Sequence, residues 1–284
     1  MKQRDVTYKT PEQPNQVRLD TIAKCNATCK SCHRFNTKRS GEMSWDMIWS
    51  ILHDIAKWKT PLREIVPVNY GEFFLHREWY SILRAISTIL QQTNIVIPTN
   101  GSKLTPKVIT GLSEIPTLRM MNFSVNAYFE DNYEDFMGLP ASNLQNIEDS
   151  IKTLKTLRPD IITWVSMVFD PMYQTDLERD FFTTHWSKIA DKVWAIPAAS
   201  ANRKDKSPMK PVLAPCRSLF SDFVIGYDGR LSSCCFDAGF TLDVGNYSGD
   251  IILDWKNPDL ENLRTVHNTH NRDKFILCQD CTYA

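Results

Sequence analysis

The chain has no excess of either charge: among its 284 residues, Lys and Arg number 33, and Asp and Glu also number 33. Such a balance does not favour nucleic acid as a partner. No apolar run reaches the about 20 residues that cross a bilayer. The polar N-terminus also lacks the basic-then-apolar layout of a secretory signal. We therefore expect a cytoplasmic protein that binds neither membranes nor nucleic acid.

Cysteine is absent from residue 33 to residue 215, although the chain contains eight cysteines in total. Three of them lie between Cys25 and Cys32, and the other five lie between Cys216 and Cys281. In a reducing compartment, grouped cysteines are more often metal ligands or catalytic thiols than disulfides. The distribution therefore predicts two separate metal or catalytic sites.

Between the two cysteine groups, strand-like and helix-like segments alternate. The predicted strands are 17–23, 65–70, 95–98, 118–125, 161–169 and 192–197. The predicted helices are 44–58, 78–91, one that begins at Thr105-Pro106, 131–137, 143–157 and 176–189. Successive β/α units predict a parallel sheet covered by helices. Six units fit either an open doubly wound sheet or an incomplete barrel.

The C-terminal third has a different pattern. Residues 198–214 are polar and contain prolines, which is typical of a linker. A hairpin is predicted from 223–227 and 230–234 around the turn at Asp228-Gly229. A last helix is predicted from Pro258 to about His267.

Cys25, Cys29 and Cys32 lie in one short loop directly after the first predicted strand. A [4Fe–4S] cluster with a full set of protein ligands uses four thiolates, so three would leave one iron open. An open coordination position distinguishes a catalytic metal site from a closed structural one. Zinc is the alternative, but it requires a fourth ligand, and His33 is too close to Cys32 for the usual finger spacing.

This CxxxCxxC motif at the end of the first strand resembles the radical SAM superfamily. The resemblance implies a partial (β/α)6 TIM barrel in which the open iron binds S-adenosylmethionine. One electron then cleaves the cofactor to methionine and a 5′-deoxyadenosyl radical, which abstracts a substrate hydrogen. Segments at the ends of the next strands resemble the family's cofactor contacts, and they supply Gly71, Glu72, Asn100, Ser124 and Asn126, with 165–168 beside the adenine. Ser31, Tyr70 and Phe73 depart from the family's usual residues at their positions.

The second cysteine group resembles the C-terminal auxiliary-cluster domain called SPASM, and more closely its shorter form, called twitch. By that resemblance, a second [4Fe–4S] cluster is held by Cys216, Cys234, Cys278 and Cys281. Cys235 is then a buried neighbour, although an exchange with Cys234 stays open. A zinc ribbon is the alternative for this region, because four cysteines also suit zinc.

These resemblances divide the chain into an extension (1–16), a radical SAM barrel (17–197), a linker (198–214) and an auxiliary-cluster domain (215–284). They imply an oxidoreductase that dehydrogenates a small molecule, with the auxiliary cluster as electron acceptor and a flavodoxin- or ferredoxin-type electron donor. A peptide-modifying radical enzyme is the first alternative. A non-catalytic iron–sulfur or zinc protein is the second. Substrate and oligomeric state are not predicted. No general base is assigned either, because a structural or solvent-exposed role is the better explanation for each candidate: Tyr70, Tyr173, Arg203 and Arg217.

Overall fold

The computed structural model describes residues 6–199 and 210–283, and its strands form an eight-stranded sheet in the order β6-β5-β4-β3-β2-β1-β7-β8. The strands are β1 Gln16–Leu19, β2 Glu64–Val66, β3 Asn94–Thr99, β4 Leu118–Ser124, β5 Ile162–Phe169, β6 Lys192–Pro197, β7 Asp222–Ile225 and β8 Leu231–Ser232. From β1 to β6 all neighbours are parallel and follow chain order. A doubly wound sheet would instead reverse its order at a switch point. The prediction of an incomplete barrel is therefore confirmed.

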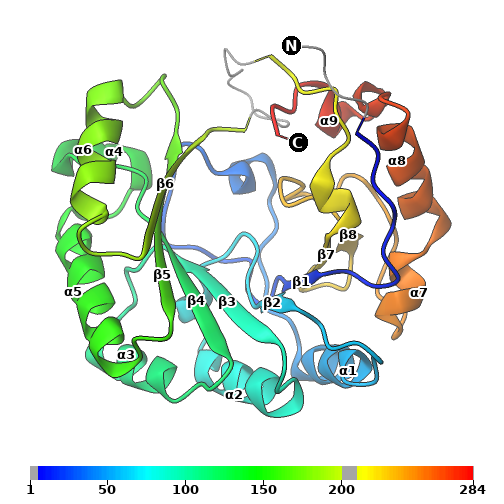
Figure 1. Ribbon diagram of the computed structural model, residues 1–284, viewed down its shortest axis with the longest axis horizontal. Helices are drawn as coiled ribbons and strands as arrows, with labels where there is room; N and C mark the ends of the chain where they lie inside the picture. The colour runs from blue at the N-terminus through cyan, green and yellow to red at the C-terminus, as the bar shows by residue number, and fades with distance from the viewer. Residues whose placement is uncertain (1–5, 200–209, 284) are drawn as a thin grey trace.

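The helices lie on the outer side of the arc that the strands form (Figure 1). The α-helices are α1 Trp45–Ile55, α2 Trp79–Ile89, α3 Pro106–Ser113, α4 Glu130–Met137, α5 Ser142–Leu157, α6 Asp176–Trp186, α7 Ile251–Trp255, α8 Pro258–Asn268 and α9 Ile276–Gln279. The short 3-10 helices are η1 His33–Asn36, η2 Phe73–Leu75, η3 Arg217–Phe220 and η4 Arg272–Lys274. Two of the predicted helix starts are capped as expected, since the side chains of Ser44 and Thr105 accept hydrogen bonds from the N–H groups of Met47 and Val108.

The two faces of the sheet differ in burial. On β3 and β4, Ile97 and Phe123 are completely buried on the side that faces the helices. Their neighbours Pro98 and Asn122, which are paired in register, are partly exposed on the concave side. Because side chains alternate along a strand, the outer face builds the core and the concave face is left open to the interior of the barrel.

The C-terminal hairpin continues the barrel sheet. Strand β7 pairs in parallel with β1, from Gln16 opposite Asp222 to Leu19 opposite Ile225, and β8 pairs antiparallel with β7. The predicted linker therefore separates two regions of the sequence that share one sheet. Residues 200–209 of that linker, like residues 1–5 of the predicted extension, lie outside the described residues.

Segments from the two ends of the chain are bonded to one another. The backbone N–H of Tyr8 donates to the Asn268 side chain (3.0 Å), and that side chain donates back to the Tyr8 carbonyl (2.9 Å). The indole N–H of Trp255 donates to the carbonyl of Pro11 (3.0 Å). The carboxylate of Asp54 on α1 accepts the buried N–H of Ile251 at the start of α7 (2.7 Å). These bonds hold the C-terminal region firmly against the barrel.

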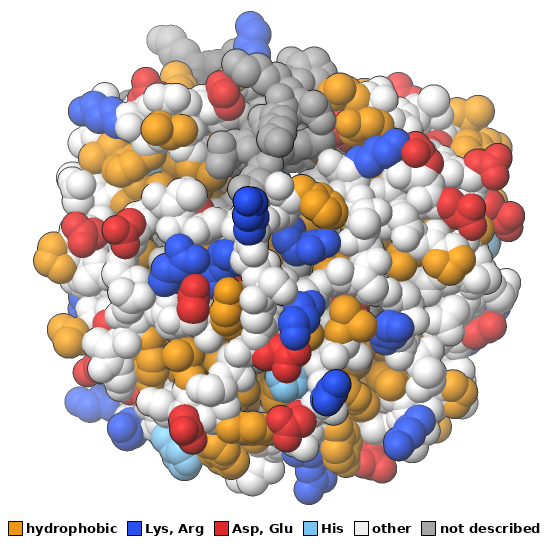
Figure 2. Space-filling view, turned by 180° about the vertical axis from the view of Figure 1, so that it is seen from behind, with side chains coloured by type: hydrophobic (Ala, Val, Ile, Leu, Met, Phe, Trp, Pro, Cys, Tyr) orange, Lys and Arg blue, Asp and Glu red, His pale blue; other side chains and the backbone are white. Residues whose placement is uncertain are grey.

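The surface carries no large field of one sign on the face shown in Figure 2, where basic and acidic side chains alternate. Among the described residues, no helix combines the length and the apolar character needed to span a membrane.

Candidate metal and cofactor site

The loop that carries the first three cysteines, residues 25–32, is anchored by the end of α4. The N–H groups of Thr28 and Lys30 donate to the carbonyls of Met137 and Phe136 (2.8 and 2.9 Å). The chain turns away directly afterwards at Gly138, whose φ of 63° is left-handed. A Cβ at Gly138 would lie 1.8 Å from the hydroxyl of Thr28, so only glycine permits this close approach. The backbone of the loop is therefore fixed independently of its cysteine side chains.

The three thiols of this loop lie close enough to influence one another. Burial, together with the neighbouring Cys32 and Cys25, raises the pKa of Cys29 to about 12. Burial also raises the pKa of Cys32, while the Arg34 side chain opposes that shift. In the metal-free protein these thiols are therefore protonated, and binding of iron must displace their protons. Three neighbouring thiols in one loop, with Arg34 as a nearby cation, suit a cluster that carries negative charge.

Glu72 and Asn100 connect the ends of β2 and β3 to this loop. The buried carboxylate of Glu72 accepts the Thr99 hydroxyl (2.8 Å) and the Asn100 N–H (2.7 Å). The side-chain amide of Asn100 in turn lies 3.1 Å from Oδ1 of Asn26 and 3.8 Å from the sulfur of Cys25. Burial raises the pKa of Glu72, and these donors oppose the shift. Glu72 therefore positions Asn100, and Asn100 contacts the cysteine loop.

Gly71 lies directly against the segment that leads into the loop. A Cβ at this position would lie 1.9 Å from the carbonyl oxygen of Ile22 and 3.0 Å from that of Lys24. The next residue, Glu72, donates its N–H to the same Lys24 carbonyl (2.8 Å). The end of β2 and the start of the cysteine loop thus meet backbone to backbone.

Ser124 is the last residue of β4 and Asn126 follows two residues later, near the strand end as predicted, but the two lie in different surroundings. Asn126 has a left-handed φ of 61°, and its amide lies 3.1 Å from the sulfur of Met137. That sulfur is 3.4 Å from the sulfur of Cys29. Ser124 pairs in register with Ser166 on the concave face of the sheet. The structure therefore brings Asn126 to the cysteine loop and places Ser124 on the wall of the barrel.

All five distal cysteines line a single cavity, which we call the five-cysteine cavity. Its lining consists of Cys216, Ser218, Leu219, Cys234, Cys235, Phe236, Leu242, His267, Arg272, Leu277, Cys278, Cys281 and Tyr283. The four predicted ligands are thus brought together from η3, the β7–β8 hairpin region and α9. Cys235 joins them, and burial raises the pKa of both Cys235 and Cys278 to about 12.

Aromatic side chains connect the two cysteine groups. The hydroxyl of Tyr70 donates to the carbonyl of Cys235. Burial raises the pKa of Tyr70 well above its usual value, and Cys235, Cys234 and Cys32 add to the shift. Phe236 packs between His33 and Tyr283, with ring centroids 5.0 and 5.3 Å apart. Tyr70 and Phe236 therefore link the residues next to Cys32 to the five-cysteine cavity.

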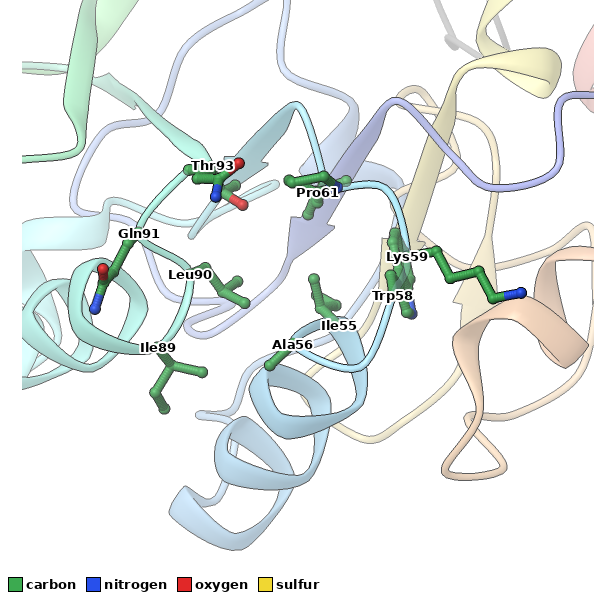
Figure 3. Close-up of a pocket in the computed structure, with 11 residues that line it drawn as sticks. Ile55, Ala56, Trp58, Lys59, Pro61, Ile89, Leu90, Gln91 and Thr93 are labelled. Atoms are coloured by element: carbon green, nitrogen blue, oxygen red, sulfur yellow. The ribbon is translucent and has the colours of Figure 1, made fainter.

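A separate hollow lies away from these sites, between the ends of α1 and α2 (Figure 3). It is lined by Ile55, Ala56, Trp58, Lys59, Pro61, Leu62, Ile89, Leu90, Gln91, Gln92 and Thr93. These residues precede β2 and β3, whereas the cysteine loop follows the end of β1. Since ligands of parallel α/β folds bind at the carboxyl ends of the strands, this hollow is not the candidate site.

Several residues of the site have no counterpart in the sequence-based predictions. Met137 and Arg34 contact the 25–32 loop, while His267 and Arg272 line the five-cysteine cavity. Arg34 could have been suspected because it lies two residues after Cys32. The other three carry no local signal, since only the tertiary fold brings them beside the cysteines.

We expect Glu72→Gln to weaken binding of S-adenosylmethionine about tenfold. One carboxylate oxygen would become an NH₂ group facing the Asn100 N–H, and an unpaired buried donor costs about 1–3 kcal/mol. Equilibrium dialysis of the labelled cofactor against anaerobically reconstituted protein measures the change. Glu114→Gln, which alters an exposed partner of Tyr80 on the C-cap of α3, is the matched control. Unchanged binding by E72Q would show that Glu72 does not position the cofactor contacts.

Comparison with known proteins agrees with this geometry. Residues 216–282 match the SPASM family, described as an iron–sulfur cluster-binding domain. No curated protein sequence matches the chain. A structure of BtrN in complex with AdoMet and 2-DOIA is similar at 16% identity and a TM-score of 0.68, covering 98% of this chain and 95% of BtrN.

Two further solved structures share the fold. Streptococcus suis SuiB bound to precursor peptide SuiA is 12% identical, with a TM-score of 0.65, over 96% of this chain and 70% of SuiB. Native anSMEcpe with bound AdoMet is 13% identical, with a TM-score of 0.67, over 94% of this chain and 88% of anSMEcpe. As the sequence resemblance predicts, the chain has the fold of BtrN, SuiB and anSMEcpe, and its residues 216–282 match the SPASM iron–sulfur cluster-binding domain.

Proposed function

We propose that this protein is a radical SAM oxidoreductase that dehydrogenates a small molecule. Cys25, Cys29 and Cys32 would hold the cluster that binds S-adenosylmethionine. Cys216, Cys234, Cys278 and Cys281 would hold the auxiliary [4Fe–4S] cluster. The observation that carries the proposal is the pairing of a three-thiol loop with a separate cavity lined by more than four thiols, joined through Tyr70 and Phe236.

The residues present fit these groups. Three thiols from one loop leave a position open on a cubane cluster, while four or more thiols around one cavity can close a second cluster. When bound, the cofactor and clusters would supply one-electron chemistry: reductive cleavage to methionine and a 5′-deoxyadenosyl radical, abstraction of a substrate hydrogen, and uptake of the remaining electron as the substrate loses a proton. A flavodoxin- or ferredoxin-type protein would supply the first electron.

The chain's own residues prepare this site in three ways. Glu72 accepts the backbone N–H of Asn100, and the side-chain amide of Asn100 is thereby held against Asn26 in the 25–32 loop. The N–H of Val168 donates to Oδ1 of Asn126 (2.8 Å), and the amide nitrogen of Asn126 lies against the sulfur of Met137; these two contacts fix the Asn126 side chain. The hydroxyl of Tyr70 bonds to the carbonyl of Cys235, and the ring of Phe236 packs against His33, so both side chains link the two cysteine groups.

A small-molecule substrate is favoured by the match with BtrN, which covers nearly all of both chains. A peptide-modifying reaction is the second candidate, because SuiB is similar in a complex with its precursor peptide and anSMEcpe in a complex with a Cp18Cys peptide. This chain covers 70% of SuiB, so part of that protein has no counterpart here.

The proposal is tested by anaerobic reconstitution with iron and sulfide, followed by addition of dithionite and S-adenosylmethionine. We expect about eight irons per chain, as two cubanes require, and the formation of 5′-deoxyadenosine. Deuterium transfer from labelled candidate substrates into 5′-deoxyadenosine would then separate alcohols and amines from peptides. Zinc in place of iron, with no 5′-deoxyadenosine formed, would contradict the proposal.

A further inference from the structure

Two basic residues line the five-cysteine cavity, and neither has a role in the function proposed above. His267 belongs to α8 and Arg272 begins η4, and each is only 1% exposed. Basic side chains are rarely buried so completely unless they are paired. Their presence beside the thiols therefore requires an explanation.

Arg272 forms hydrogen bonds to the backbone close to the first and the last of the five distal cysteines. Its Nη1 donates to the carbonyl of Ala214, two residues before Cys216 (3.0 Å), and to that of Tyr283, two residues after Cys281 (2.9 Å). The Nε of Arg272 is buried and has no hydrogen-bond partner, and within residues 6–199 and 210–283 no carboxylate forms an ion pair with it. Its charge is permanent, because arginine does not lose its proton in proteins.

His267 presents a second donor without a partner. Its Nδ1 accepts the backbone N–H of Cys216 (3.2 Å), so the neutral ring carries its proton on Nε2. That Nε2 is buried and has no hydrogen-bond partner.

A buried donor that lacks a partner costs about 1–3 kcal/mol, and a native structure that contains one usually has an acceptor to receive it. Here two such N–H groups belong to residues that line the same cavity as five cysteines. The thiolate and sulfide sulfurs of an iron–sulfur cluster are acceptors. The Asp237 carboxylate is a nearby negative charge, and it raises the pKa of Cys234 and Cys278, whereas Arg272 lowers that of Cys278. However, Asp237 is held by the N–H groups of Thr241 and Leu242 and does not line the described cavity.

We propose that Arg272 and His267 bind the sulfurs of the auxiliary cluster and that the charge of Arg272 raises the reduction potential of that cluster. This inference rests on the proposed function, since it requires the auxiliary cluster. Reduction adds a negative charge to a buried group, and a fixed cation nearby stabilises the more negative state. Net charge and hydrogen bonds to sulfur are known determinants of cluster potential. A higher potential makes the cluster a better acceptor for the electron that remains on the substrate.

The test measures the midpoint potential of the auxiliary cluster alone. The full-length chain carrying Cys25→Ala, Cys29→Ala and Cys32→Ala holds only the second cluster, whose reduction is followed by anaerobic EPR-monitored titration. In that background, we expect R272Q to have a more negative midpoint than its parent. R272K, which keeps the charge, should lie close to the parent. R84Q serves as the control, because Arg84 is an exposed cation on α2, away from both cysteine groups, and its removal should leave the midpoint unchanged.

The outcomes separate the inference from the function on which it rests. An R272Q chain that binds its cluster with the parental midpoint overturns the inference alone. Loss of the cluster from both R272Q and R272K would also overturn it, because Arg272 would then act only by holding Ala214 and Tyr283 in place. If the parent with Arg272 intact binds no [4Fe–4S] cluster, the proposed function itself fails.

Discussion

Cys29→Ser is expected to abolish the formation of 5′-deoxyadenosine and to lower the iron content from about eight to about four per chain. A hydroxyl is a poor ligand for a cluster that is held by thiolates, so the open cluster should not assemble. The auxiliary cluster, which lies on separate residues, should remain. Iron and sulfide analysis, together with chromatography of the reaction with dithionite, measures both effects.

The fold should tolerate this change. The loop is held by the bonds of Thr28 and Lys30 to α4, and these do not involve the side chain of Cys29. We expect the metal-free variant to lose less than about 1 kcal/mol of stability. Ser31→Ala, in the same loop, is the matched control and should keep both iron content and activity. If C29S retained eight irons and its activity, another residue would have to be the third ligand.

The order of the six barrel strands, β1 to β6, could be predicted from the sequence, but their lengths could not. Strand β1 ends at Leu19, whereas 17–23 was predicted, because Ile22 forms a bridge with Glu42 instead of continuing along β2. Strand β2 ends at Val66, whereas 65–70 was predicted, because Pro67 has no N–H to donate to a neighbouring strand. Local patterns identify extended segments, but the partner of each segment is a tertiary property.

The same distinction explains the hairpin. The alternation around Asp228-Gly229 predicts two antiparallel strands, and the structure confirms them as β7 and β8. Nothing in that local pattern predicts that β7 would pair with β1, more than 200 residues earlier in the chain. The C-terminal region therefore extends the barrel wall, which brings its cysteines towards the 25–32 loop.

Within the candidate site, motifs identified the cysteines and the polar residues at the strand ends, but not how these residues bond to one another or which basic side chains lie beside them. The cysteine spacings were informative because cluster ligation needs thiols in short loops. The bond from Glu72 to Asn100, and the burial of Arg272 and His267, depend on side chains that meet across strands and helices. From the sequence alone, a single arginine or histidine in a polar helix would be predicted to be exposed to solvent.

Gly71→Ala is expected to destabilise the protein by about 3 kcal/mol and to reduce loading of the first cluster. The new Cβ would lie 1.9 Å from the Ile22 oxygen and 2.9 Å from its carbonyl carbon. Both are backbone atoms, which cannot rotate aside as the end of a side chain could. The segment from Ile22 to Lys24 would have to move, and it leads directly into Cys25. Urea unfolding of the metal-free protein, and iron analysis after reconstitution, measure the two effects.

Gly245→Ala is the control that separates steric overlap from backbone strain. Gly245 has a φ of 94°, but no atom lies within 4 Å of the position that a Cβ would take. Alanine there should cost about 1–2 kcal/mol through strain alone, with no loss of iron from the first cluster. Gly71 does not have a left-handed φ, so its substitution tests the overlap alone. Equal losses of stability in the two variants, with full cluster loading in both, would show that the contact between Gly71 and Ile22 does not hold the 25–32 loop in place.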